Sequence, residues 1–326
     1  MNTELFEQLH AEELIADSSF EKIKEHSNAK LFSLHWEIKI LLYLGVLLLC
    51  GGLGILIYEN IDSIGHQAIL IFIALVCAAC FIYCFKTKLP FSTAKVEAPN
   101  VYFDYILLLG CLTFISFIAY LQFQYNVFGT RYGLATFFPM LVLFFSAYFF
   151  DHLGVLSLAI TNLSAWMGIT VTPSQLLRAN DFNSNTIIYA GLFLGALLIA
   201  FAYASKKRKF KQHFEFTYAN FGVHVLFISC LAAIFHFNLY YLLWFLLLAA
   251  ISFFFYKTSI QNKSFYFLVV ITLYSYVGIS YVVLQLLSSI STSGMGPIYL
   301  GLIYFIVSGI SLVFFLIKNN RKIKAA

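Results

Sequence analysis

Residues 186–235 read TIIYAGLFLGALLIAFAYASKKRKFKQHFEFTYANFGVHVLFISCLAAIF, two long apolar runs on either side of a block of positive charges. Each run is close to the length of about 20 residues that a helix needs to cross the hydrocarbon layer of a membrane. The block consists of Lys206, Lys207, Arg208, Lys209 and Lys211. Because lysine and arginine collect in cytoplasmic loops, this block predicts which end of the helix pair faces the cytoplasm.

The rest of the chain has the same character. Hydrophobic residues make up 61% of the 326 residues and charged residues only 11%, with a mean hydropathy of +0.85. Ten apolar stretches are long enough to span a membrane: 39–58, 67–85, 101–121, 132–150, 153–172, 186–204, 217–235, 239–256, 265–287 and 297–317. They lack the alternating polarity of barrel strands. We therefore predict an all-α, polytopic integral membrane bundle of about ten transmembrane helices.

The positive charges predict the orientation of this bundle. With the N-terminus in the cytoplasm, 18 lysines and arginines fall on the inner side and only Arg131 and Arg178 on the outer side. The loop that carries Lys86 to Lys95 and the block at 206–211 then face the same side, so an even number of crossings separates them. Merging the two spans around Asp151 would leave three crossings. We predict that both termini are cytoplasmic and interpret the basic residues as topology signals.

Three segments follow from this pattern. Residues 1–38 form a short cytoplasmic helical segment, 39–317 the ten-helix transmembrane domain and 318–326 a basic cytoplasmic tail. The first segment is too short for a core of its own, so we expect it to pack on the membrane domain or to contact a membrane or cytoplasmic protein partner. We expect no cleavable signal peptide, because an acidic, polar stretch precedes the first apolar run. The expected partners include the lipid bilayer and no nucleic acid.

The sequence contains no arrangement of residues typical of catalysis. Nucleophile motifs, phosphate-binding glycine loops and zinc-binding helix motifs are all missing from it. We therefore predict no catalytic residue, no metal ligand, no cofactor and no enzyme activity. The six cysteines fall within predicted spans and are interpreted as free thiols. Cys77, Cys80 and Cys84 share one helix face, which suits either soft-metal ligation or simple packing, and packing is favoured because buried cysteine behaves as a small hydrophobe.

Polar residues inside the spans are the candidates for lining a cavity. Asn162 and Trp166 lie in the span at 153–172, and Tyr274, Tyr281 and Gln285 lie along one face of the span at 265–287. Asn220 and His224 form a four-residue pair in the span at 217–235. Such groups line solute pathways, but they also form hydrogen bonds that hold helices together in lipid.

A second polar cluster follows the first span. Glu59, Asn60, Asp62 and His66 form a candidate outer-interface cluster, in which helical spacing places the carboxylates and the imidazole on one side. Carboxylate and imidazole groups can bind a divalent cation. A polar cap at the outer water interface is the favoured interpretation.

Residues 36–66, WEIKILLYLGVLLLCGGLGILIYENIDSIGH, resemble the opening of a bacterial family of predicted multi-spanning membrane proteins, domain of unknown function 2157. The shared features are a short helical lead, a tryptophan before a glycine-rich first span, and an Asn-Trp-Asp-like ending. Trp36, Asn60 and Asp62 match this pattern, whereas Ile61 replaces the second tryptophan. The resemblance covers about the first 85 residues. It implies a location in the bacterial inner membrane and a repeated helical architecture, and it carries no activity.

These observations favour a transporter of a small solute or a lipid-like molecule, because many spans occur with little mass outside the membrane. The alternative is a non-transporting membrane scaffold or sensor that acts with a partner protein. The nearly uncharged interior of the spans and the separate N-terminal segment favour this alternative.

Overall fold

The computed structural model describes residues 9–12, 14–17, 19–21, 35–59, 65–171, 185–290 and 296–325. The chain divides into two compact units, residues 1–58 and residues 59–326. In the described residues the secondary structure is helical and no strand is present.

The first unit contains α3, His35–Glu59, which coincides with the predicted first span. The apolar part of this helix is Ile38–Gly52. Nearer the N-terminus, His10 Nε2 lies 2.8 Å from Asp17 Oδ1, and the His10 ring stacks on Phe20 at a centroid distance of 4.2 Å. These contacts join two short stretches of the segment that precedes α3.

The second unit contains nine long helices among its described residues. They are α5 (His66–Thr87), α6 (Phe103–Tyr125), α7 (Tyr132–Phe150), α8 (Leu153–Val171), α9 (Asn185–Arg208), α10 (Glu215–His236), α11 (Tyr241–Gln261), α12 (Phe265–Ile290) and α13 (Gly296–Ala325), with a short 3₁₀ turn, η2 (Gln212–Phe214), before α10. Each is long and apolar enough to cross a membrane. With α3, they correspond to the ten predicted spans. The last helix continues through the predicted basic tail as far as Ala325, because lysine and arginine are good helix formers and are favourable near a helix C-terminus.

A tight turn separates α7 from α8, whose apolar sequences are almost continuous. Asp151 adopts a left-handed conformation (φ 61°) and ends α7, and α8 begins two residues later at Leu153. This conformation stops a helix, and asparagine and aspartate adopt it more readily than most residues. Two spans therefore occupy residues 132–171, as predicted, and four helices separate the α5–α6 loop from the α9–α10 loop.

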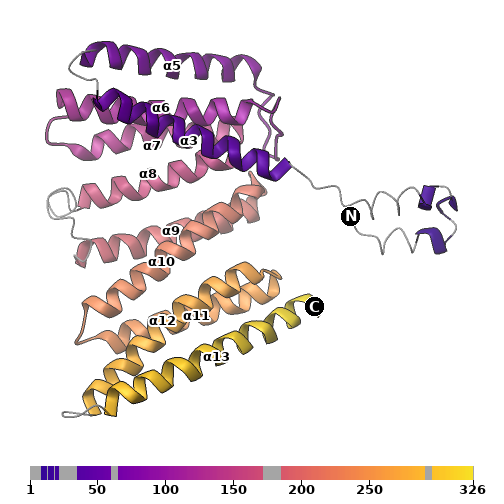
Figure 1. Cartoon of the computed structure of the whole chain (residues 1–326), viewed down its shortest axis with the longest axis vertical. Coiled ribbons are helices and arrows are strands. Elements are labelled where there is room, and N and C mark those ends of the chain that lie inside the picture. The colour runs from indigo at the N-terminus through magenta and orange to yellow at the C-terminus, as the bar shows by residue number, and fades with distance from the viewer. Residues whose placement is uncertain are drawn as a thin grey trace. The chain divides into compact units, whose positions relative to one another are not determined.

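The helices of the second unit run from α5 at the top of Figure 1 to α13 at the bottom, and each packs chiefly against its neighbours in the chain. Helix α10 contacts α8 and α12 as well as its chain neighbours α9 and α11. It also has the largest buried share of the nine spans. Two apolar cores meet on this helix. The first joins α5 to α10 around Leu107, Leu156 and Leu198, and the second joins α10, α11 and α12 around Phe227 and Leu248.

Glycines allow α9 and α10 to approach closely. A Cβ atom on Gly195 would lie 2.7 Å from the backbone nitrogen of Leu226, and one on Gly222 would lie 2.8 Å from Ile199 Cγ1. Close backbone contact of this kind is the usual basis of helix association in lipid. Gly191 and Gly195, four residues apart on α9, both lie at this contact with α10.

Candidate functional site

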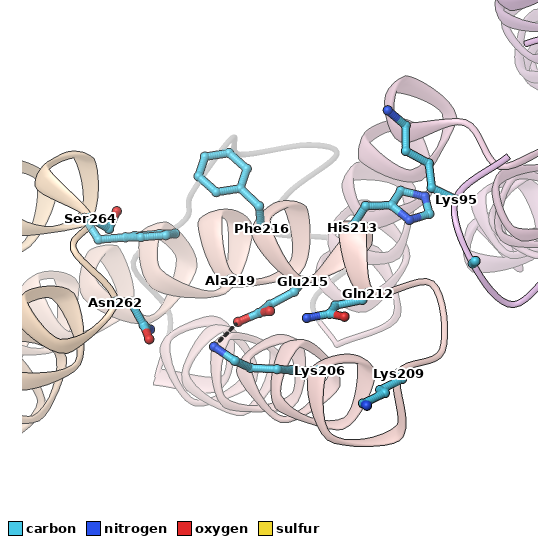
Figure 2. Close-up of a pocket in the computed structure, with 12 residues that line it drawn as sticks. Lys95, Lys206, Lys209, Gln212, His213, Glu215, Phe216, Ala219, Asn262 and Ser264 are labelled. Atoms are coloured by element: carbon cyan, nitrogen blue, oxygen red, sulfur yellow. Dashed lines mark ion pairs between the residues drawn. The ribbon is translucent and has the colours of Figure 1, made fainter. Parts of the chain in front are cut away.

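A polar cavity of about 850 Å³ lies at one end of the second unit (Figure 2). We call this end the basic end. The cavity is lined by residues of the α5–α6 loop, the α9–α10 junction and the α11–α12 junction, namely Ala94, Lys95, Lys206, Lys209, Gln212, His213, Glu215, Phe216, Ala219, Asn262, Ser264 and Phe267. The loops predicted to face the cytoplasm thus meet at one end of the unit.

Lysines dominate the charge of this cavity. Lys206 Nζ lies 3.1 Å from Glu215 Oε1, and the dashed line in Figure 2 marks this ion pair. Lys95 and Lys209 form no ion pair with any other described residue. Three lysines therefore line the cavity with a single carboxylate, which leaves an excess of positive charge there.

A buried ion network lies beside the cavity. Asp151 Oδ1 is 3.2 Å from Lys211 Nζ and 2.6 Å from His213 Nε2, and the side chains of Asp151 and Lys211 are each only 1% exposed. Leaving such charges unpaired would be costly in a region from which water is excluded. The network joins the α7–α8 turn to the α9–α10 junction.

The same network holds the α5–α6 loop in place. The Lys211 amide donates to the Thr93 carbonyl at 2.8 Å, and the Val96 amide donates to Asp151 Oδ2. The hydroxyl of Ser205 donates to the Lys211 carbonyl at 3.0 Å. Lys211 itself has a positive φ of 47°, an uncommon conformation for lysine that persists where surrounding contacts hold it. Lys95, which lies between Thr93 and Val96, is thereby positioned at the rim of the cavity.

A hydrogen-bonded cluster continues from the cavity into the α10–α12 interface. The Tyr266 hydroxyl donates to Asn220 Oδ1 at 2.7 Å, and His224 Nδ1 lies 2.7 Å from the Tyr274 hydroxyl. His224 Nε2 lies 3.3 Å from the Tyr266 hydroxyl, which links the two pairs. The ring of Phe216, which lines the cavity, contacts the ring of Tyr266 at 5.8 Å. Three of the predicted cavity-lining residues, Asn220, His224 and Tyr274, therefore lie together next to the cavity.

Apolar packing closes the middle of the α10–α12 interface. Phe227, Leu231 and Leu248 are buried there, and a Cβ atom on Gly278 of α12 would collide with Leu248 Cδ2 of α11. The polar side chains of this interface thus fall into two groups, one on each side of the Gly278 crossing.

Two further predicted residues form the outer of these groups. Gln285 Nε2 donates to the Tyr281 hydroxyl at 2.9 Å, and that hydroxyl donates to Asn238 Oδ1 at 3.1 Å. Asn238 lies in the turn between α10 and α11, at the opposite end from the cavity. We call the two groups and the apolar crossing between them the α10–α12 seam.

The remaining predicted cavity-lining residues lie elsewhere. Asn162 Nδ2 donates to the Leu158 carbonyl of its own helix at 3.3 Å, and the Trp166 ring contacts Phe137 of α7 at 5.5 Å. Helix α8 packs against α6, α7, α9 and α10, whereas α12 packs against α10, α11 and α13. The structure therefore does not place Asn162 and Trp166 with the polar residues of α12.

The outer-interface cluster lies only partly within the described residues. Asn60 and Asp62 are outside them, and Glu59 is exposed. His66 Nδ1 lies 2.7 Å from the hydroxyl of Tyr120 on α6. Within the described ranges, no group of three or more metal-ligating side chains comes together.

The cysteine face of α5 is a packing surface. Cys77, Cys80 and Cys84 are buried, and a Cβ atom on Gly110 of α6 would lie 2.9 Å from Cys80 Cβ. Cys77 Sγ donates to the Gly110 carbonyl at 3.6 Å. None of the six cysteines, all of which are described, forms a disulfide.

Two more cavities lie among the helices. One of about 910 Å³ lies among α11, α12 and α13, and one of about 410 Å³ lies among α5, α6 and α7. Both are mainly apolar, and hydroxyls in the larger one pair with each other, as between Ser275 and Ser252 at 2.8 Å. Lipid chains fill apolar gaps of this kind, so these cavities give no sign of a polar solute.

Sequence reasoning missed the residues that build the basic end. The sequence pattern indicates only that Asp151 separates two spans. It indicates only that Lys95, Lys209 and Lys211 fix the orientation in the membrane. The available signal was a carboxylate in a two-residue turn on the side that carries nearly all the cations. A carboxylate that is buried in such a place needs a cationic partner.

A family of predicted membrane proteins, domain of unknown function 2157, has a model that matches residues 7–156. The match extends beyond the first 85 residues that carried the resemblance and ends just after the α7–α8 turn. No curated protein and no solved structure matches the chain. Together with the nine apolar helices, the match makes this chain a multi-pass helical membrane protein.

Proposed function

We propose that this protein transports a small solute or a lipid-like molecule across the inner membrane of a bacterium, with its basic end in the cytoplasm. One observation carries the proposal. A polar cavity of about 850 Å³ opens at the basic end and is continued by hydrogen-bonding side chains between two membrane-spanning helices.

The arrangement along the α10–α12 seam suits alternating access. The inner group can contact a solute that enters from the cavity, and the outer group can contact it on the opposite side. The apolar crossing at Gly278 separates the two groups, and the cavity lies on the side of the inner group. Transporters bind substrate near such a closed point and open it from one side at a time.

Flux through reconstituted protein tests the proposal. We expect protein-dependent uptake or lipid transfer in proteoliposomes for one member of a panel of small polar solutes and fluorescent lipids. Gly278→Leu adds bulk at the crossing, so we expect it to reduce the rate at least tenfold. Gly309→Ala is the control, because nothing lies within 4 Å of a Cβ atom at that position.

The same experiment shows how the proposal fails. Folded protein without flux for the whole panel contradicts transport. Equal rates for the wild type and for folded Gly278→Leu contradict the seam as the path.

A scaffold or sensor is the second candidate, and the apolar packing at the Gly278 crossing favours it. Such a protein acts through a partner, and we assign the contact to residues 1–38. Deletion of residues 1–30 should then remove a co-purifying partner, whereas a transporter should retain its flux.

A further inference from the structure

We propose that the basic-end cavity binds a phosphate group, carried either by a lipid headgroup or by a soluble phosphate ester. This inference rests on the proposed function only in treating the cavity as the inner mouth of the α10–α12 seam. It names the chemical class of the molecule that enters there.

The charge of the cavity calls for an anion. Lys95, Lys206 and Lys209 line the cavity together with one carboxylate, Glu215, which is already paired with Lys206 at 3.1 Å. Lys95 and Lys209 have no carboxylate partner among the described residues. Lysine binds phosphate as a point charge, and two such charges match the charge of a phosphate monoester.

Neutral hydrogen-bonding groups complete the lining. The side chains of Gln212, Asn262 and Ser264 face the cavity and make no hydrogen bond to another described residue. Amide and hydroxyl groups of this kind can donate to phosphate oxygens. Figure 2 shows Gln212 beside Lys206 and Lys209, and Asn262 and Ser264 on the opposite side of the cavity.

The cavity is held in shape by groups that do not line it. Buried Lys211 binds Asp151 at 3.2 Å and Thr93 through its backbone at 2.8 Å, and this fixes the loop that carries Lys95 relative to the turn that carries Lys209. Binding sites gain affinity when their ligand groups are positioned in advance. Lysines that only fix the orientation of the protein in the membrane need to lie on one side of it. They need not come from two distant loops to line the same cavity.

Apolar side chains border the cavity on the side of the membrane. Phe216 and Ala219 of α10 and Phe267 of α12 contribute this border. Basic pockets between transmembrane helices at the cytoplasmic side commonly bind phosphorylated lipid headgroups. The border suits the start of an acyl chain, whereas a soluble ester would use only the lysines and amides.

Binding to the purified full-length protein tests this inference without any measurement of flux. The probes are phosphatidate and phosphatidylcholine in mixed micelles, and glycerol 3-phosphate in solution. We expect phosphatidate, glycerol 3-phosphate or both to raise the unfolding temperature in a saturable way. Lys95→Gln and Lys209→Gln should each weaken binding about fivefold and together about 30-fold, on the scale of one lysine near an anionic surface.

Lys207→Gln is the matched control. Lys207 belongs to the same basic block but does not line the cavity, so its loss should leave binding within about twofold of wild type. A response to phosphatidate alone assigns a lipid headgroup, and a response to glycerol 3-phosphate assigns a soluble ester.

Three results overturn the inference: no response to phosphatidate or glycerol 3-phosphate, a response of equal size to phosphatidylcholine, whose phosphate diester is neutralised by its choline, or an equal loss in Lys207→Gln. Binding without flux leaves the inference intact and contradicts transport. Flux that is unaffected by the Lys95→Gln/Lys209→Gln double substitution contradicts the inference alone.

Discussion

At the scale of single residues, the most consequential group is Asp151. It ends α7 in a left-handed conformation and accepts contacts from Lys211, His213 and the Val96 amide. One carboxylate therefore makes the turn, neutralises a buried lysine and anchors a loop. Its pairing also explains why a lysine can be 1% exposed.

Replacing this carboxylate should destabilise the protein strongly. Asp151→Asn keeps the size of the side chain and tolerates the positive φ, but it leaves the buried Lys211 ammonium without its counter-ion. We expect a loss of about 3–5 kcal/mol in the free energy of unfolding, the usual cost of breaking a buried pair. Denaturant unfolding in detergent micelles, followed by circular dichroism, measures it.

A double substitution separates charge from packing. Asp151→Asn combined with Lys211→Met removes both charges, so it should recover more than half of the loss. Lys206→Gln is the comparison, because the Lys206–Glu215 pair is partly exposed and such pairs contribute at most about 1 kcal/mol. An Asp151→Asn variant as stable as wild type would contradict the structural role of the network.

At the scale of helices, α9 and α10 form the tightest pair in the second unit. Its basis is small residues, since Gly195 and Gly222 leave no room for a side chain between the backbones. Because α10 also contacts α8, α11 and α12, a shift of this pair would disturb both cores. The pair also leads directly into the loop that carries Lys209 and Lys211.

A side chain at this contact should therefore weaken the fold. In Gly195→Val the new Cβ would meet the Leu226 backbone, which cannot move as a flexible side chain can. We expect a loss of about 1–3 kcal/mol in the free energy of unfolding, which is typical of overpacking. Gly309→Ala, at an open position on α13, should change stability little. An equal effect in the two variants would show that the α9–α10 contact is not close.

At the scale of the whole molecule, the arrangement of loops agrees with the distribution of charge. The α5–α6 loop, the α9–α10 junction and the α11–α12 junction meet around one cavity, as an even number of crossings between them requires. The orientation of this end toward the cytoplasm remains a prediction from the excess of lysine and arginine.

Cysteine labelling measures that orientation. Lys207→Cys places a thiol at the exposed basic end, and Leu239→Cys places one at the opposite end, where Leu239 is 84% exposed. In intact cells a membrane-impermeant maleimide should label only Leu239→Cys, and Lys207→Cys should react only in inverted vesicles. Five native cysteines are buried, and Cys50→Ser removes the sixth from the background. Labelling of Lys207→Cys in intact cells would reverse the proposed orientation.

Part of the site was predictable and part was not. Asn220 and His224 share a helix face by spacing alone, and in the α10–α12 seam the structure pairs Asn220 with Tyr266 and His224 with Tyr274. Asn162 and Trp166 were predicted on similar grounds, but Asn162 bonds to its own helix and Trp166 packs against α7. Periodicity tells which residues share a face, and it does not tell which helix that face meets.

The sequence alone determined that this chain is a multi-pass helical membrane protein, where most of its helices begin and end, and that the Lys86–Lys95 loop and the Lys206–Lys211 block share one side. These properties follow from the free-energy cost of placing charged groups and unpaired backbone groups in hydrocarbon. Each stretch of sequence determines this cost by itself. Only the tertiary structure decided that Asp151 pairs with Lys211 and His213 and that three distant loops line one basic cavity. These contacts join residues about 60 positions apart, and they depend on how helices pack in three dimensions, which no local pattern of polarity records.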